Sequence, residues 1–489
     1  GKTFVAYQIL RELQAVEKRI DLFIMEEFNQ NNQCEWLSKV FSHKLCIDDP
    51  IKDFNLLLDY CVQKGLDFDP GLLQRYFQSL KDDAISLSAD MFAIVFENLS
   101  DIIAETLSGT DVVFIDDVQW LDSSSLQVFQ RLLPKLVANN HTVIIGSRPD
   151  YILDVSLSTP IIYKHLENLG GPEARYLLKN EIPIMSDGAV QTILNMTNGN
   201  PLFMVEMSKV IKKSLDPDNF ILAESDLNRL EKEGIISDTI ENLLLHEYEH
   251  LDEGSQQMLK VASIIGKAFA IEELTVLSKQ ALKEDFNQIV GHLGDRRIID
   301  IKTYDPGTEY VFSNYLMRDA IYRTVLLGEK RVLHDQIGSF YEQKYSASLY
   351  SHYELIANHF IFAANSEKAG RYCLLAGEKT ARMAAYAESN YYFEYALQYQ
   401  SDPQIRYQIL LEMVKNYINQ GDAQKAQTHL DMIFTAYGDL VEDQFYYHKT
   451  RVIIMTGSYQ DALYYIQKTL PKISDKHCFY AIQLRYLDA

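Results

Sequence analysis

The most constraining stretch of this sequence runs from Asp111 to Asp122 and reads DVVFIDDVQWLD. Its apolar run VVFI has no polar alternation, which is typical of a strand buried on both faces of a parallel sheet. Two acids, Asp116 and Asp117, follow directly. The stretch therefore predicts a buried parallel strand that brings two carboxylates to the carboxyl edge of an α/β sheet, where such folds bind ligands.

These two acids give the strand the pattern of a Walker B motif. A carboxylate at this position can hold Mg²⁺ directly or through water, and we assign this role to Asp116. Its neighbour Asp117 is the candidate catalytic acid that orients or deprotonates an attacking water. A buried strand that ends in a polar turn is also common in other proteins, so the pattern needs support from elsewhere in the chain.

The first three residues, Gly1, Lys2 and Thr3, match the end of a P-loop, GxxxxGK[ST]. In that loop backbone amides and a helix N-terminus cradle the phosphates, the lysine reaches the β and γ oxygens, and the hydroxyl ligates Mg²⁺. An apolar series at helical spacing follows, as a P-loop requires. The sequence thus predicts a nucleotide phosphate site with Mg²⁺, with Thr3 also a metal ligand. Because Gly1 is not Met, we expect the chain to be a fragment.

A further candidate follows the next predicted buried strand, Thr142 to Ile145. This strand ends in a polar pair that includes Arg148. A cationic side chain at the tip of the strand beside Walker B can sense the γ-phosphate, so Arg148 is a candidate catalytic residue. The alternative is an ordinary surface arginine.

A turn signal at Asn198 to Pro201 opens another apolar helix and contains the element GNPLF. GKT, DDVQWLD and GNPLF, in this order, resemble the motifs of the STAND signalling ATPases. Within that class the chain is most similar to the AAA-type module found downstream of class III cyclase domains in soluble adenylyl cyclases, and in related multidomain kinases and LuxR-type transcription regulators.

The resemblance implies that Pro201 packs near the adenine, and that Lys2 and Thr3 serve the phosphates and Mg²⁺. It also implies metal and water roles for Asp116 and Asp117. Many AAA proteins have a glutamate where this chain has Asp117, which is one methylene shorter. The resemblance therefore implies slow hydrolysis, which suits a switch.

Helical patterns over 239–251 and 256–264, a further helix and two short strands predict a winged helix. In the STAND class this fold usually packs on the nucleotide domain, and the acidity of the chain favours that arrangement over DNA binding. The segment YVFSNYLMRDAIY resembles the family's FSHxLxRxxxY segment, with Asn314 in place of the histidine. Asn314 can still donate a hydrogen bond, so it is a candidate nucleotide-binding residue.

The last part of the chain is helical and repetitive. Gly421 aligns with Gly457, and Ala426 with Ala462, both at an offset of 36 residues. This is near the tetratricopeptide period, so we expect repeats that bind protein partners. A group of tyrosines either lines a groove or belongs to the core: Tyr386, Tyr391, Tyr392, Tyr395 and Tyr399.

The predicted fold is an α/β P-loop NTPase core with a parallel sheet, followed by a helical lid, a winged helix and an all-α tetratricopeptide-like solenoid. The expected boundaries are 1–160, 161–235, 236–330 and 331–489. The predicted function is an ATP-binding, slowly hydrolysing switch module of a multidomain signalling protein. We expect this protein to resemble an adenylate or guanylate cyclase, with its catalytic domain upstream of this chain. The alternatives are a non-hydrolysing interaction scaffold and a LuxR-type regulator without its DNA-binding domain.

A net charge of −22 argues against nucleic acid or an anionic membrane as the main partner. Five cysteines without a CxxC pair suit a reducing compartment. We find no apolar run of about eighteen residues and no signal peptide, so we expect a cytoplasmic protein without a membrane partner. The sequence contains no GxSxG or HExxH motif that would indicate another chemistry.

Overall fold

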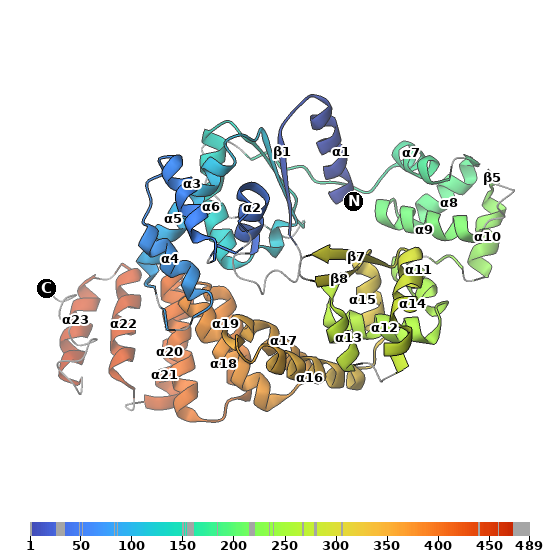
Figure 1. Ribbon diagram of the computed structural model, residues 1–489. Coiled ribbons are helices and arrows are strands. Elements are labelled where there is room, and N and C mark those ends of the chain that lie inside the picture. Colours follow the sequence, from blue (N-terminus) through green and yellow to red (C-terminus); the bar gives the residue numbers. More distant parts are fainter. Residues whose placement is uncertain are drawn as a thin grey trace.

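The structure is a computed structural model. It describes residues 2–472 except 26–34, 48, 51, 83, 86, 149–150, 152, 154–160, 183, 215–220, 234, 238, 267, 278–280, 305–306, 439–440 and 458. Figure 1 shows the order of the elements along the chain. Among the described helices, none has the length and apolar character to cross a membrane.

A three-stranded parallel sheet lies near the start of the chain, with strand order β1-β2-β3. Its strands are β1 (Ile20–Ile24), β2 (Val112–Asp116) and β3 (Thr142–Ile145). All five residues of β2 are buried, which confirms the prediction of a central buried strand. Strand β1 ends at Ile24, shortly before residues 26–34, which lie outside the described part.

Helices cover both faces of this sheet. On one face, Val113 and Ile115 of β2 belong to a large apolar cluster with the helices from α2 to α6. On the other face, Leu10 of α1 packs against Phe114. The helices of this sheet unit are α1 (Lys2–Ala15), α2 (Glu35–Leu45), α3 (Phe54–Gln63), α4 (Pro70–Ser79), α5 (Ala89–Thr106) and α6 (Ser123–Ala138).

The next group of helices has its own apolar cluster, centred on Leu178, Ile193 and Met204. It contains α7 (Gly171–Glu181), α8 (Asp187–Thr197), α9 (Pro201–Ser214) and α10 (Glu224–Lys232). A short parallel pair, β4 (Ile184–Met185) and β5 (Ile221–Leu222), joins its loops. In Figure 1, α1 lies between the sheet and α9.

A third group combines helices with an antiparallel sheet of order β6-β8-β7. The two strands predicted from the sequence are β7 (Ile299–Tyr304) and β8 (Gly307–Phe312), and they pair as a hairpin. The other elements are α11 (Ile240–Glu249), α12 (Glu253–Ile265), β6 (Ala268–Phe269), α13 (Ile271–Leu277), α14 (Ala281–Asp295) and α15 (Tyr315–Thr324).

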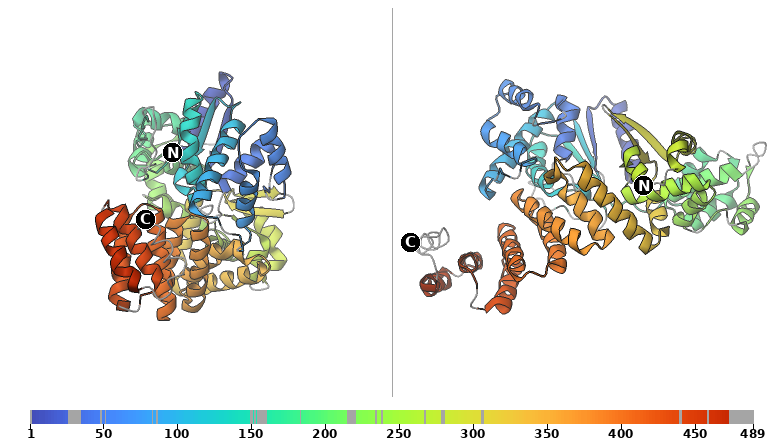
Figure 2. Two further views of the ribbon diagram at one scale, coloured as in Figure 1. Left: turned by 90° about the vertical axis from the view of Figure 1, so that its left-hand side faces the viewer. Right: turned by 60° about the horizontal axis from the view of Figure 1, so that its bottom comes forward.

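The rest of the described chain is a row of stacked helices that curves along one side of the sheet unit (Figures 1 and 2). Gly421 and Gly457 both adopt positive φ, which favours glycine, and Ala426 and Ala462 are both buried. This local match supports the repeat inferred from their offset. The helices are α16 (Leu327–Lys344), α17 (Tyr353–Ala363), α18 (Ser366–Arg382), α19 (Tyr386–Tyr399), α20 (Pro403–Asn419), α21 (Ala423–Tyr437), α22 (Asp443–Met455) and α23 (Tyr459–Thr469).

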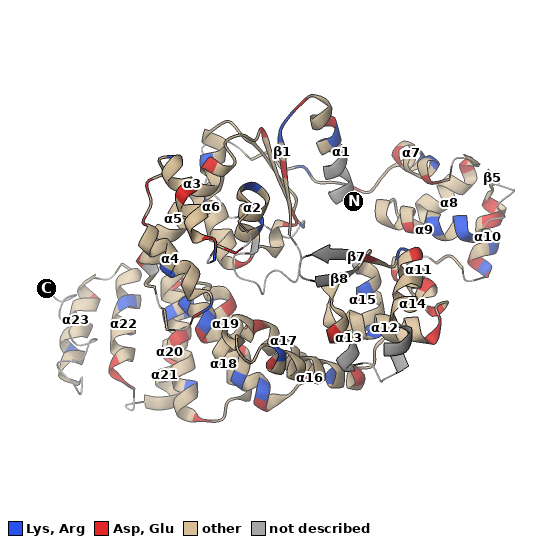
Figure 3. Ribbon diagram, in the orientation of Figure 1, with Lys and Arg blue, Asp and Glu red and all other residues tan. Residues whose placement is uncertain are grey.

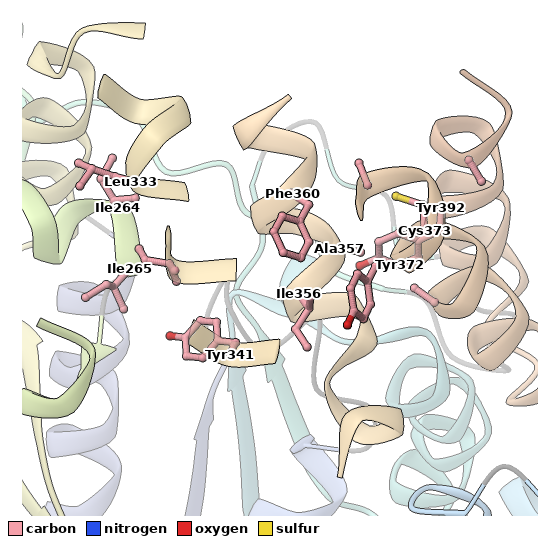
Figure 4. Close-up of a cluster of buried hydrophobic side chains, with 14 of the residues drawn as sticks. Ile264, Ile265, Leu333, Tyr341, Ile356, Ala357, Phe360, Tyr372, Cys373 and Tyr392 are labelled. Atoms are coloured by element: carbon pink, nitrogen blue, oxygen red, sulfur yellow. The ribbon is translucent and has the colours of Figure 1, made fainter. Parts of the chain in front are cut away.

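One continuous core joins the third group to the stacked helices. Figure 4 shows Ile264 of α12, Leu333 of α16, Phe360 of α17 and Tyr372 of α18 as members of this cluster. Tyr392 of α19 is also part of it, so at least this tyrosine of the predicted group is core. Figure 3 shows acidic and basic residues interspersed along the helices.

Candidate functional site

Asp116 ends the central strand β2 and is 1% exposed. Its carboxylate oxygen Oδ1 accepts the backbone N–H of Asp117 at 3.0 Å. Gly146, the residue after β3, lies against this carboxylate, because a β-carbon on Gly146 would come 2.1 Å from Oδ1. A glycine at this position therefore leaves the space that the Asp116 side chain occupies. Sequence reasoning missed Gly146, whose signal was a glycine at the end of a predicted strand.

Asp117 turns the chain away from the sheet. It adopts a left-handed conformation, with φ at 56°, and begins the 3₁₀ turn Val118–Trp120 that leads to α6. Aspartate tolerates this conformation better than most residues, because its short side chain hydrogen-bonds locally. The carboxylate accepts a hydrogen bond from Nε2 of Gln119 at 2.9 Å. Asp117 is half-buried at the sheet edge.

Arg148 reaches the same edge from β3. Oε1 of Gln119 accepts its backbone N–H at 3.2 Å, and its guanidinium lies over the ring of Trp120 at 4.5 Å. One amide therefore links Asp117 to Arg148, while a cation–π contact holds the arginine side chain. The structure brings these two predicted residues together through Gln119 and Trp120. Both belong to the motif DDVQWLD, yet neither was assigned a role from the sequence.

The P-loop residues can be placed only in part. The helix α1 begins at Lys2 and lies between the sheet and α9 in Figure 1. Gly1 and the side chains of Lys2 and Thr3 lie outside the described part of the chain. Their phosphate and metal roles therefore stay predictions.

Pro201 is the first residue of α9, in the group of α7 to α10. The two residues before Pro201 have local structural roles. Oδ1 of Asn200 caps the helix by accepting the N–H groups of Leu202 and Phe203, at 3.0 and 3.2 Å. Gly199 adopts a positive φ, and a β-carbon there would come 2.3 Å from the carbonyl oxygen of Leu169. The contact of Pro201 with adenine stays a prediction.

Asn314 caps the helix α15 in the third group. Its Oδ1 accepts the N–H of Leu316 at 3.0 Å. Its Nδ2 is buried and has no hydrogen-bond partner in the described structure. A buried amide donor without a partner is costly, so Asn314 has a free donor that a ligand can satisfy. Asp116, Asp117 and Arg148 thus lie together at the sheet edge. Pro201 belongs to the group of α7 to α10, and Asn314 to the group of α11 to α15.

The chemistry of the sheet edge suits a magnesium-bound nucleotide. Mg²⁺ prefers oxygen ligands and is commonly held by one or two carboxylates together with substrate phosphates. Asp116 and Asp117 supply such oxygens, and Gly146 keeps the position next to Asp116 without a side chain. The residues that the structure describes contain no group of three or more His, Cys, Asp or Glu side chains arranged to hold a metal ion.

Comparison with known proteins gives distant similarities. No protein-family model matches the chain. An uncharacterized protein of Rhizobium meliloti (strain 1021) is 23% identical over 310 residues, which cover 59% of this chain and 28% of that protein. The chain thus spans little more than a quarter of the length of this relative. A solved STAND protein with a tetratricopeptide repeat sensor, from Pyrococcus horikoshii, has a TM-score of 0.35 and 14% identity, covering 95% of this chain and 70% of that structure.

Proposed function

We propose that this chain is an ATP-binding, slowly hydrolysing switch module of a multidomain signalling protein. The observation that carries the proposal is the buried carboxylate of Asp116 at the end of β2, packed against Gly146 and followed by the half-buried Asp117. Walker B acids need this placement, at the carboxyl edge of a parallel sheet. The resemblance of the motifs extends the proposal to a cyclase-like protein whose catalytic domain lies upstream.

Each predicted residue has a role in this function. Lys2 and Thr3 bind the phosphates, Asp116 holds Mg²⁺ with Thr3, and Asp117 orients the attacking water. Arg148 senses the γ-phosphate from the tip of β3. Bound ATP with Mg²⁺ supplies the phosphoryl group and the charge that these side chains recognise.

The groups that follow the sheet complete the switch. In this proposal α7 to α10 form the helical lid, α11 to α15 the winged helix, and α16 to α23 the sensor repeats. Pro201 contacts the adenine, and the unpartnered Nδ2 of Asn314 donates to the nucleotide. Because these contacts exist only when both groups close on the sheet edge, nucleotide binding favours the closed conformation.

The direct test uses Lys2→Ala in a protein that carries the complete P-loop. Titration with ATP and Mg²⁺ by calorimetry should show that binding is lost. The matched control is Lys18→Ala, because Lys18 is an exposed lysine that follows α1. An affinity for ATP that is unchanged in Lys2→Ala would contradict the proposal.

A second candidate function is a non-hydrolysing scaffold in which the nucleotide is a structural ligand. The observation that favours it is the hydrogen bond from Gln119 to Asp117 at 2.9 Å, which occupies an oxygen of the proposed base. Single-turnover measurement of phosphate release separates the two functions. The switch releases phosphate slowly, whereas the scaffold binds ATP and releases none.

A further inference from the structure

The start of α6, in the sheet unit, is hydrogen-bonded to the start of α19, in the stacked helices. The N–H of Ser123 donates to Oε1 of Glu388 at 3.1 Å, and the hydroxyl of Ser123 donates to Oε2 of the same carboxylate. One turn further along α6, Nε2 of Gln127 donates to the carbonyl oxygen of Ala384 at 3.3 Å. Ser123 and Glu388 are 265 residues apart in the sequence.

Apolar packing supports these hydrogen bonds. Ala384 lies in the turn between α18 and α19 and is only 5% exposed, because it belongs to the apolar cluster of the sheet unit. Tyr386 packs against the same cluster. Ala384 also adopts a φ of 57°, which is unfavourable for a residue with a β-carbon. The turn between α18 and α19 is therefore held in a strained conformation, with Ala384 inside the core of the sheet unit.

The start of α6 is also connected to the proposed ATP site. Asp122 caps α6 by accepting the N–H and the hydroxyl of Ser125, at 2.9 and 2.5 Å. Between Asp117 and Asp122 lies only the 3₁₀ turn with the residue that follows it. Two carboxylates, from Asp122 and Glu388, therefore share the amino end of α6, where unpaired N–H groups and the helix dipole favour negative charge.

Glu388 has a second neighbour inside the stacked helices. Oε2 of Glu354, in α17, accepts a hydrogen bond from Nζ of Lys379, in α18, at 2.7 Å. Both side chains of this ion pair are buried. Burial raises the pKa of Glu354, Lys379 opposes the shift, and the charge of Glu388 adds to the rise. The hydroxyl of Ser389, the residue after Glu388, also donates to the carbonyl oxygen of Gly377 in α18 at 2.7 Å. A change in the packing of α18 against α19 is therefore transmitted to the start of α19, where Glu388 lies.

We propose that Glu388 is a positioning residue that couples the stacked helices to the ATP site. It acts through Ser123 and α6 on the turn that begins at Asp117, and so sets the place of the proposed base. The effect on hydrolysis rests on the proposed function, but the link between the two units does not.

The link is tested first without nucleotide, by hydrogen exchange in the full chain. Glu388→Ala removes the acceptor of the Ser123 N–H, so exchange at the first turn of α6 should be about tenfold faster, as expected for loss of a charged hydrogen-bond acceptor. Glu388→Gln keeps one acceptor oxygen and should restore part of the protection. Glu394→Ala is the matched control, because Glu394 is an exposed glutamate of the same helix. Equal exchange in Glu388→Ala and the control would overturn the proposal.

The second measurement is single-turnover phosphate release with ATP affinity in parallel. Glu388→Ala should release phosphate about tenfold more slowly at unchanged affinity, because only the base is displaced. If exchange changes but release does not, the link is merely structural and the proposal fails. If the wild type binds no ATP, the proposed function fails, while the exchange result still decides the link. Should Glu388→Ala not fold, Ser123→Ala removes one donor and should show the same changes at smaller size, and no change would overturn the proposal.

Discussion

The backbone of Gly146 lies against the carboxylate of Asp116, so closely that a β-carbon on Gly146 would come 2.1 Å from Oδ1 and 3.1 Å from Cγ. Backbone hydrogen bonds hold this arrangement from both sides. The N–H of Gly146 donates to the carbonyl oxygen of Ile115 at 2.8 Å, and its own carbonyl oxygen accepts the N–H of Val118 at 3.0 Å. These bonds fix the backbone of Gly146, so a side chain at this position would have to push the carboxylate of Asp116 aside.

Gly146→Ala should therefore displace the carboxylate of Asp116 and lower the affinity for ATP with Mg²⁺ about tenfold, because loss of an interaction of a charged group costs on the order of 1.5–3 kcal/mol. Calorimetric titration measures the affinity. Gly109→Ala is the control, because a β-carbon there would meet only Nη1 of Arg19 at 3.8 Å. Equal affinities in the two variants would show that Asp116 is not a nucleotide or metal ligand.

Asp117→Asn should bind ATP normally and lose hydrolysis by roughly a hundredfold or more, as for removal of a general base. Asparagine also tolerates the left-handed conformation that residue 117 adopts, so the turn should be kept. Single-turnover phosphate release is the measurement. If Asp117→Asn hydrolyses ATP at the wild-type rate, another group activates the water.

Elements with a strong local pattern were predictable from the sequence. The apolar run from Val112 to Ile115 forms the central strand, because a strand buried on both faces needs apolar residues throughout. Asp122 caps α6 as its position before an apolar helix predicts. Gly421 and Gly457 adopt positive φ in equivalent turns, which is the physical reason for their regular spacing.

Features that depend on distant segments could not be predicted. The need for glycine at position 146 arises from a side chain on the neighbouring strand, and the bonds of Glu388 to Ser123 join segments 265 residues apart. A glycine at the end of a predicted strand was a local signal for Gly146, but the local sequence identifies the partner in neither relationship. The contacts of Gln119 and Trp120 depend on the left-handed conformation of Asp117, which the motif alone does not specify.

A buried pair of histidines lies where α15, α16 and α17 meet. Nδ1 of His334 and Nδ1 of His359 are 3.0 Å apart, and the hydroxyl of Tyr322 lies 3.2 Å from Nε2 of His334. Burial, with Arg318 and Lys330 nearby, lowers the pKa of His334 from 6.5 to about 4. Burial and the charge of His334 lower the pKa of His359 further.

This pair should make the chain less stable in mild acid. The unfolded chain takes up protons on both histidines below pH 6.5, but the folded chain does not until a lower pH. Their contribution to stability is therefore full above pH 6.5 and is lost as the pH falls towards 4, at up to about 1.4 kcal/mol per pH unit for each histidine. Urea unfolding between pH 7 and 5 measures the slope.

The double variant His334→Leu/His359→Leu should have a shallower slope than the wild type. Part of the slope should remain, because His448 is also buried, with a pKa lowered to about 3 by desolvation. A slope that is the same in the double variant and the wild type would mean that the pair does not titrate in this way.

The ion pair of Glu354 and Lys379 supplies the last prediction. The two side chains are 3% and 5% exposed, and burial raises the pKa of Glu354 while Lys379 opposes the shift. Lys379→Met leaves a buried carboxylate without its cation, which should lower the free energy of unfolding by about 3–5 kcal/mol at pH 7. Because Glu354 has its folded pKa above its unfolded value of 4.5, protonation should relieve this loss as the pH falls.

Urea unfolding at pH 7 and pH 5 measures both effects, and the double variant Glu354→Leu/Lys379→Met is the control. It has no buried charge, so it should lose much less stability than Lys379→Met and show no relief in acid. If the single and double variants lose the same stability at both values of pH, lost packing rather than an unpaired charge is the cause.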